Sequence, residues 1–147
     1  MARTRLVPLA RWALFFMLFN FIGALGGALM MWIAPDTFGM IPLLALIQQN
    51  LPLLGQYFHS FAWPGVCLLV LIGLPHLSGA ALTMSRSSMA PMQVVSSGLI
   101  LLAWIVLQLM VVFGPNPMSV GYLVIALIEI TIGVLWSVRN RKQRAAE

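Results

Sequence analysis

The chain has 147 residues, of which 61% are hydrophobic and 7% are charged. This composition lies far outside the range of soluble globular domains. Because a membrane core about 30 Å thick needs roughly 20 apolar residues per helix, four such helices nearly fill the chain and leave no room for a soluble domain.

The eight basic residues predict how the chain is oriented. They lie before the first apolar run, between the second and third, and after the fourth: Arg3, Arg5, Arg11, Arg86, Arg139, Arg141, Lys142 and Arg144. The other two connections, residues 34–59 and 114–117, contain no lysine or arginine. Since positively charged connections stay in the cytoplasm, we expect both termini there. These charges meet anionic lipid headgroups at helix ends, so they indicate lipid partners and no nucleic acid.

The first apolar run predicts a membrane helix over residues 12–33. Trp12 and Trp32 lie where aromatic belts form at the two membrane interfaces. Gly23 and Gly27 are four residues apart, a spacing that lets a second helix approach closely. We expect this glycine face to pack inside the bundle rather than to form a dimer interface.

The connection 34–59 is unusual for an external loop, because its segment 41–47 is strongly apolar but too short to span the membrane. A short helix starting near Pro42 would lie at the interface, with its leucines in lipid or against the bundle. We favour a connector that anchors to the membrane surface. The alternative is a lid over a cavity that opens outward, since long connections are functional in some proteins.

The remaining apolar runs predict three further helices, over residues 61–83, 91–113 and 118–138. Pro75 removes one backbone hydrogen bond inside the first of these and is expected to kink it. The charged tail that follows the last helix is expected to be mobile. The predicted fold is therefore all-α: residues 1–147 form a single polytopic membrane domain, an antiparallel bundle of four transmembrane helices.

The sequence contains no nucleotide-binding, zinc-protease or paired-cysteine motif. The single cysteine, Cys67, lies in an apolar run and is expected to pack as a small hydrophobic side chain. His59 is expected at the outer interface and His76 well inside the membrane, so we do not expect the two histidines to share a metal ion. The sequence therefore predicts no cofactor, no metal and no catalytic residue.

Polar residues inside the spans are the remaining candidates for a functional site. At a helical rise of about 1.5 Å per residue, one polar residue of each helix lies roughly 9–15 Å inside the cytoplasmic boundary: Asn20, His76, Ser97 and Glu129. Glu129 is the only acidic residue within a span. A carboxylate in lipid is costly, so it must face the interior, find a partner or hold its proton, and His76 is the natural partner. Gln108 lies closer to the outside and is a secondary candidate.

Two interpretations of this polar cluster remain open. It can be functional, as a proton relay or as a site for the polar head of a ligand, because intramembrane acids are functional by default. Alternatively, it is a hydrogen-bonded clasp that holds the helices in register. One carboxylate does not decide between them.

Three short stretches carry a resemblance to known proteins. They are Pro35-Asp36 with Gly39-Met40, Tyr57-Phe58-His59-Ser60-Phe61 with Pro64-Gly65, and Trp104-Ile105-Val106 with Gln108. Through them the chain resembles a broad group of small four-helix bacterial membrane proteins that are loosely similar to DoxX-like proteins. The resemblance implies a multi-pass protein of the bacterial plasma membrane (the inner membrane). It carries no assigned activity, so no catalytic residue follows from it.

The leading functional hypothesis is a non-enzymatic accessory or ligand- or lipid-binding subunit, in a larger membrane complex or a homo-oligomer. The alternative is a proton-coupled small-molecule transporter that uses Glu129 and His76. An intramembrane enzyme acting on a lipid or quinone would need a second strong acid–base group besides His76, and the sequence shows none.

Overall fold

A computed structural model describes residues 8–34, 45–46, 48–50, 53, 60–112 and 117–145. In the connection 34–59, residues 45–46, 48–50 and 53 are described and are helical. Most of the rest, including His59, lies outside the described residues, so the surface anchor and the lid stay predictions. Residues 114–116 of the second external connection also lie outside them.

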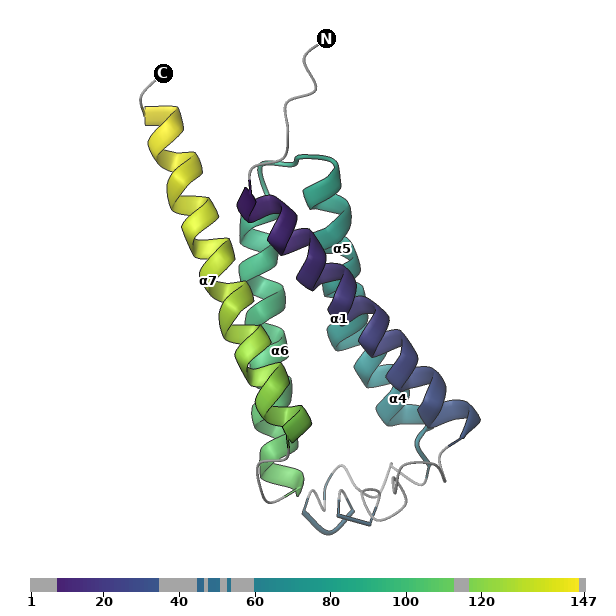
Figure 1. Cartoon of the computed structure of the whole chain (residues 1–147). Helices are drawn as coiled ribbons and strands as arrows, with labels where there is room; N and C mark the ends of the chain where they lie inside the picture. The colour runs from purple at the N-terminus through teal and green to yellow at the C-terminus, as the bar shows by residue number, and fades with distance from the viewer. Residues whose placement is uncertain are drawn as a thin grey trace.

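Four long apolar helices make up the described chain (Figure 1). Helix α1 spans Pro8–Ile33, α6 spans Ala90–Val112 and α7 spans Pro117–Ala145. The second membrane helix consists of three consecutive segments: α4 (Ala62–Leu68), the π-helical segment η2 (Leu69–Gly73) and α5 (Leu74–Met84). The described ranges contain no strand. The predicted all-α bundle of four helices is confirmed.

Each of the four helices is long and apolar enough to cross a membrane. Only 22% to 33% of the residues in each apolar window are buried. Large apolar side chains such as Trp12, Ile22 and Leu127 are at least half exposed. A surface of this kind is favourable against lipid and unfavourable against water, so the chain is a multi-pass membrane protein.

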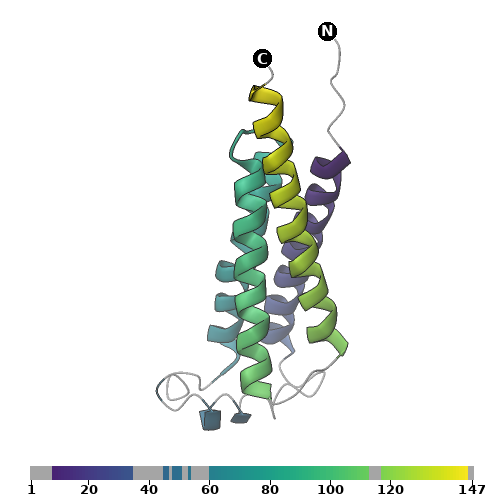
Figure 2. The ribbon, with the colours of Figure 1, turned by 90° about the vertical axis from the view of Figure 1, so that its left-hand side faces the viewer.

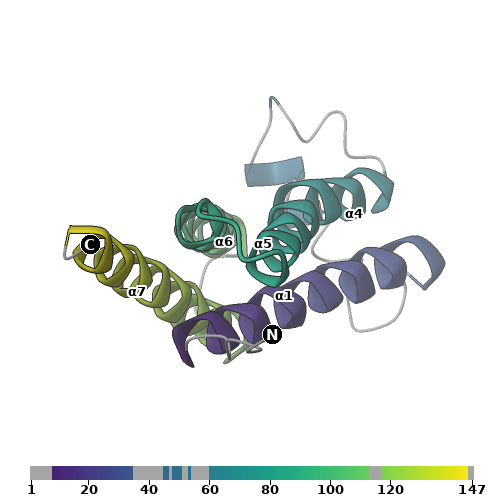
Figure 3. The same cartoon turned by 90° about the horizontal axis from the view of Figure 1, so that it is seen from above.

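Helices α6 and α7 approach each other through glycine, and they lie side by side in Figure 2. A Cβ atom on Gly133 would lie 2.9 Å from the backbone nitrogen of Val95, and one on Gly98 would lie 3.1 Å from the backbone nitrogen of Ile130. Only glycine allows two helix backbones to come this close. In the end view of Figure 3, α6 is seen nearly along its axis, whereas α1 and α7 are seen obliquely and therefore tilt relative to it.

The start of α1, the end of α7 and the turn between α5 and α6 lie at one end of the bundle (Figure 1). We call this the terminal end and the opposite one the loop end. The described basic residues all belong to the terminal end: Arg11, Arg86, Arg139, Arg141, Lys142 and Arg144. The charged tail that was expected to follow the last helix is itself helical as far as Ala145, because arginine and lysine favour helix and α7 continues through them.

The turn after α5 contains the one described non-glycine residue with a positive φ, Arg86, at 58°. The Arg86 N–H donates to the carbonyl oxygen of Thr83, and the Ser87 N–H donates to that of Leu82. This pair of bonds is the Schellman arrangement that commonly ends helices with glycine at the position of Arg86. The turn brings α6 back alongside α5.

The sequence predicts a kink at Pro75, and the structure has a π-helical segment next to it. At the end of η2 the N–H of Leu74, the residue before the proline, donates to the carbonyl oxygen of Leu69, five residues back. Single π turns of this kind occur within α-helices, frequently at functional sites. Since Pro75 has no N–H to donate, the wider turn accommodates the break in the regular bonding pattern just before His76.

Two clusters of buried apolar residues fill the interior, one in each half of the bundle. The cluster in the terminal half comprises Ala10, Ala13, Met17, Ala80, Ala90, Val94, Ile132 and Trp136. The cluster in the loop half comprises Ala24, Ile72, Leu101, Ile105 and Ala126. Alanine is frequent in both, which is typical of membrane helices that pack closely.

Candidate functional site

A layer of buried polar side chains lies between the two apolar clusters. Each membrane helix contributes one of them: Asn20 from α1, His76 from α5, Ser97 from α6 and Glu129 from α7. Their exposed fractions are 1% for Asn20 and 0% for the other three. Burial of polar groups in a membrane protein is tolerated only when they find partners, so the contacts of each one define the site.

Glu129 is at the centre of this layer. The amide nitrogen Nδ2 of Asn20 donates to Glu129 Oε1 over 2.7 Å. On the other side of the carboxyl group, His76 Nε2 lies 3.2 Å from Glu129 Oε2. One carboxyl group therefore connects α1, α5 and α7 in the middle of the bundle.

The carbonyl oxygen of Ile72 determines which ring nitrogen of His76 carries a fixed hydrogen. It lies 2.6 Å from His76 Nδ1. A carbonyl oxygen only accepts, so Nδ1 carries a hydrogen and donates it. The Nε2 atom is then the ring nitrogen that can either accept a proton from Glu129 or donate one to it.

A proton shared by His76 Nε2 and Glu129 Oε2 would leave both side chains neutral when it is on Oε2 and would make them an ion pair when it is on Nε2. Neither arrangement carries a net charge, which is the condition under which two ionisable groups are tolerated in a medium of low dielectric constant.

Ser97 does not join Glu129, although the sequence predicted it in the same cluster. Its hydroxyl group donates to the carbonyl oxygen of Pro75 over 3.1 Å. The side chains of Gln93 and Ser78 donate to the same oxygen over 3.2 and 2.8 Å. The bonds from Ser97 and Gln93 hold α6 against α5, whereas that from Ser78 lies within α5. Gln93 was not among the residues predicted from the sequence, although it is four residues before Ser97 and so lies on the same face of α6.

A cavity of about 120 Å³ adjoins the polar layer on the side of the loop end. All four membrane helices line it, with Gly27 from α1, Leu68 from α4, Leu101 from α6 and Tyr122 from α7 among the lining residues. Asn20 stands at the inner end, because every other lining residue of α1 follows it toward the loop end. The cavity therefore ends at the cluster that holds Glu129.

Asn20 lies at this inner end, and its side-chain oxygen, Oδ1, is a hydrogen-bond acceptor. Its Nδ2 atom is bonded to Glu129, but Oδ1 is buried and has no hydrogen-bond partner in the described part of the chain. The orientation of the amide follows from its partner: Glu129 Oε1 accepts, so the nitrogen rather than the oxygen faces it. A buried carbonyl oxygen without a partner costs about 1–3 kcal/mol, which makes Oδ1 a position where a ligand would gain a hydrogen bond.

The wall of the cavity contains three further polar groups, the indole of Trp104, the amide of Gln108 and the hydroxyl of Tyr122. Gln108 thus belongs to this wall and not to the layer around Glu129. A Cβ atom on Gly23 would lie 3.0 Å from the Tyr122 hydroxyl oxygen. Gly23 and Gly27 both line the cavity, so the glycine face predicted on α1 points into the bundle.

Among the described residues, no three side chains of histidine, cysteine, aspartate or glutamate come together in a way that could hold a metal ion. His76 and Glu129 supply two such groups, and they are bonded to each other, to Asn20 and to Ile72. Cys67 is half-buried in α4 and is a free thiol. The chemistry that the site supports is hydrogen bonding and the sharing of a proton between His76 and Glu129.

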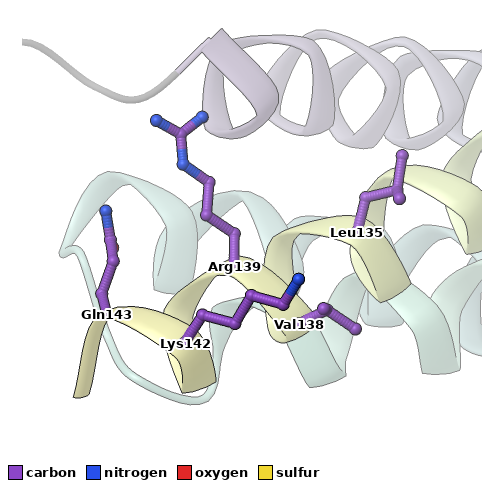
Figure 4. A pocket seen from close by; sticks show the side chains of 5 residues that line it. All are labelled: Leu135, Val138, Arg139, Lys142 and Gln143. Carbon is purple, nitrogen blue, oxygen red and sulfur yellow. The ribbon is translucent and has the colours of Figure 1, made fainter. Parts of the chain in front are cut away.

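A shallow hollow lies on α7 at the terminal end, lined by Leu135, Val138, Arg139, Lys142 and Gln143. Figure 4 shows that the long side chains of Arg139 and Lys142 extend from the last turns of α7, beside the apolar side chains. Cations next to apolar side chains suit a lipid headgroup and acyl chain at the membrane surface. This hollow is far along α7 from Glu129 and is separate from the cavity.

Comparison of the chain with known protein families, with curated proteins and with solved structures gives no match.

Proposed function

We propose that this protein binds a small ligand between its membrane helices, as an accessory or ligand-binding subunit in the bacterial plasma membrane. The observation that supports this proposal is the cavity whose inner end is the polar layer of Glu129, His76 and Asn20. Ligand sites are typically apolar hollows in which a few polar groups fix orientation. The cavity has this composition, and all four helices contribute to it.

The described basic residues at the terminal end support an orientation with both termini in the cytoplasm. In this orientation the cavity lies in the outer half of the membrane, and ligand reaches Asn20 from that side. The bacterial plasma membrane is part of the same proposal and is supported by the resemblance to DoxX-like proteins.

A purely structural clasp explains the bonds of Glu129 but not the cavity beside them. A clasp is most stable when every polar atom is paired and the surrounding space is filled. Here Asn20 lines the cavity, and its acceptor Oδ1 is buried and unpaired within the described chain. A ligand that fills the space and bonds this atom accounts for both features.

The proposal is tested by filling the cavity. In Gly23→Leu the new side chain would start 3.0 Å from the Tyr122 hydroxyl and enter the cavity. In the matched control Gly26→Leu it would start where no atom lies within 4 Å. Native mass spectrometry of protein moved from membranes into nanodiscs should show a bound small molecule on the wild type and on the control, but not on Gly23→Leu. An equal bound mass on all three proteins, or on none, contradicts the proposal.

The outer faces of the helices leave room for the accessory-subunit part of this proposal. With 22% to 33% of each apolar window buried, these faces must be covered by lipid or by another membrane protein. Purification in a mild detergent, followed by measurement of the mass of the assembly, separates a larger complex from a homo-oligomer, and a monomer would contradict the subunit role.

A second function, proton-coupled transport of a small molecule, is favoured by one observation. His76 and Glu129 lie within hydrogen-bond distance, where they can share a proton, and Asn20, which is bonded to Glu129, lines the inner end of the cavity. Reconstituted in liposomes, a transporter of this kind moves protons when its substrate is added. Glu129→Gln abolishes that movement, because an amide does not release a proton. Substrate binding without proton movement in the wild type would leave binding alone as the function.

A further inference from the structure

The atoms at the inner end of the cavity also indicate the chemistry of the ligand. We propose that the ligand is an apolar molecule carrying a hydroxyl or N–H group, and that this group donates a hydrogen bond to Oδ1 of Asn20. The inference rests on the proposed ligand-binding function and specifies its substrate class.

The bond that Asn20 makes to Glu129 determines that the ligand must donate. Oδ1 is an acceptor, and it is the amide atom left without a partner among the described residues. Turning the amide over would break the 2.7 Å bond from Nδ2 and place Oδ1 against Glu129 Oε1. A ketone or ether would bring a second acceptor to Oδ1 and gain nothing. A hydroxyl or N–H group satisfies it.

The walls and the volume of the cavity restrict the rest of the molecule. Ala24, Leu101 and Ile105 form part of the wall and belong to the apolar cluster of the loop half. The volume of about 120 Å³ is close to the roughly 150 Å³ of an apolar cavity that holds one benzene molecule. The cavity therefore accepts one ring, or the first carbons of a chain whose remainder extends toward the loop end.

Water is the competing occupant. At about 30 Å³ per molecule the cavity has room for roughly four waters. A buried water normally makes 2–4 hydrogen bonds, and the polar groups of the lining are Asn20, Trp104, Gln108 and Tyr122. The mostly apolar wall favours a ligand that needs one hydrogen bond over a group of waters that needs many.

A hydrogen bond on Oδ1 also acts on Glu129 through the amide. Donation to Oδ1 polarises the amide group and strengthens Nδ2 as a donor to Oε1. Asn20 thereby connects occupation of the cavity with the hydrogen bond to Glu129, and its signals report both.

The test uses three ring molecules of similar size that differ in one group. Phenol has a donor, anisole has only an acceptor, and toluene has neither. Each is titrated into the full-length protein in nanodiscs, with ¹³C,¹⁵N-labelled asparagine observed by NMR. Asn20 is one of four asparagines, so replacing the other three (Asn50, Asn116 and Asn140) by glutamine leaves its signals alone.

Phenol is expected to shift the side-chain carbonyl signal of Asn20 saturably and to bind about 5–10-fold tighter than anisole and toluene, the range expected for one hydrogen bond. Gly23→Leu should remove the shift and Gly26→Leu should keep it. Diacylglycerol, a lipid with a free hydroxyl group, is added to the nanodisc to identify the source of the hydroxyl group of the ligand. If it competes with phenol, the ligand is a lipid. If it does not compete, the ligand is a small molecule dissolved in the membrane.

The outcomes separate the two proposals. If anisole or toluene binds as tightly as phenol, the donor chemistry is wrong while the cavity remains a ligand site. If no probe binds saturably, and Gly23→Leu and the wild type carry the same bound mass after purification, both proposals are overturned and water is the occupant.

Discussion

The two halves of the bundle differ in what the helices present to one another. In the terminal half, Gly133 on α7 meets backbone, since a Cβ there would lie 2.9 Å from the nitrogen of Val95. In the loop half, Gly23 and Gly27 on α1 meet only the tips of side chains, the hydroxyl of Tyr122 and a methyl group of Leu68. In the terminal half, α6 and α7 pack with their backbones in contact. In the loop half, side chains keep the helices further apart, and a cavity lies between them.

Glu129 lies at the boundary between these two halves, so its surroundings differ on its two sides. Toward the terminal end, the closed half carries the apolar cluster of Met17, Val94 and Ile132. Toward the loop end, Asn20 connects the carboxyl group with the cavity. The cavity thus reaches the layer around Glu129 from the loop end, which is the asymmetry that the proposed one-sided binding site requires.

The largest expected effect comes from removing the carboxyl group at this boundary. Glu129→Leu leaves Nδ2 of Asn20 and Nε2 of His76 without partners inside the bundle. Such stranded groups cost about 1–2 kcal/mol each, so the free energy of unfolding should fall by about 3 kcal/mol. It is measured by titration with sodium dodecyl sulfate from a mild detergent.

Glu129→Gln is the matched control, because an amide can accept from Asn20 and donate to Nε2 of neutral His76. Its free energy of unfolding should stay within about 1 kcal/mol of wild type. A loss as large as that of Glu129→Leu would mean that the negative charge of Glu129, and not its hydrogen bonds, stabilises the layer. If Glu129→Gln folds normally and also binds the ligand, neither folding nor ligand binding needs the proton of Glu129. Proton-coupled transport is then the one proposed role that needs it.

A smaller effect tests whether the terminal half is closed by backbone contact. Gly133→Ala would place a methyl group against the nitrogen of Val95 and the carbonyl oxygen of Pro91, which cannot move independently of α6. We expect a loss of about 2 kcal/mol in the free energy of unfolding. Gly121→Ala on the same helix meets no atom within 4 Å and should change it by less than about 0.5 kcal/mol. Equal losses in the two variants would contradict the close packing of α6 on α7.

Much of this architecture could be predicted from the sequence, because the length of an apolar run is set by the thickness of the membrane. The helical rise along each run placed Asn20, His76, Ser97 and Glu129 at similar depths, and all four are buried in the structure. Depth follows from counting residues along one helix, which requires no knowledge of the others.

The rotation of each helix about its axis could not be predicted in the same way. When nearly all faces of a helix are apolar, hydrophobicity does not indicate which face is buried. Ser97 is therefore at the expected depth but faces Pro75, and the close contact at Gly133 and the cavity beside Asn20 went unrecognised. The π-helical segment before Pro75 depends on the same packing, since a proline alone predicts a kink and not its form.

The smallest effect concerns the turn that closes the terminal end. Arg86 holds a φ of 58°, where its Cβ is crowded by the backbone, and the Schellman bonds around it suit glycine. Arg86→Gly relieves about 1–2 kcal/mol of crowding but adds flexibility to the unfolded chain. The net result should be a gain of about 0.5–1 kcal/mol in the free energy of unfolding. Arg86→Ala keeps the Cβ atom and removes the charge, so it should give no gain. If both variants stabilise the protein equally, the charge at residue 86 and not its backbone is what strains the terminal end.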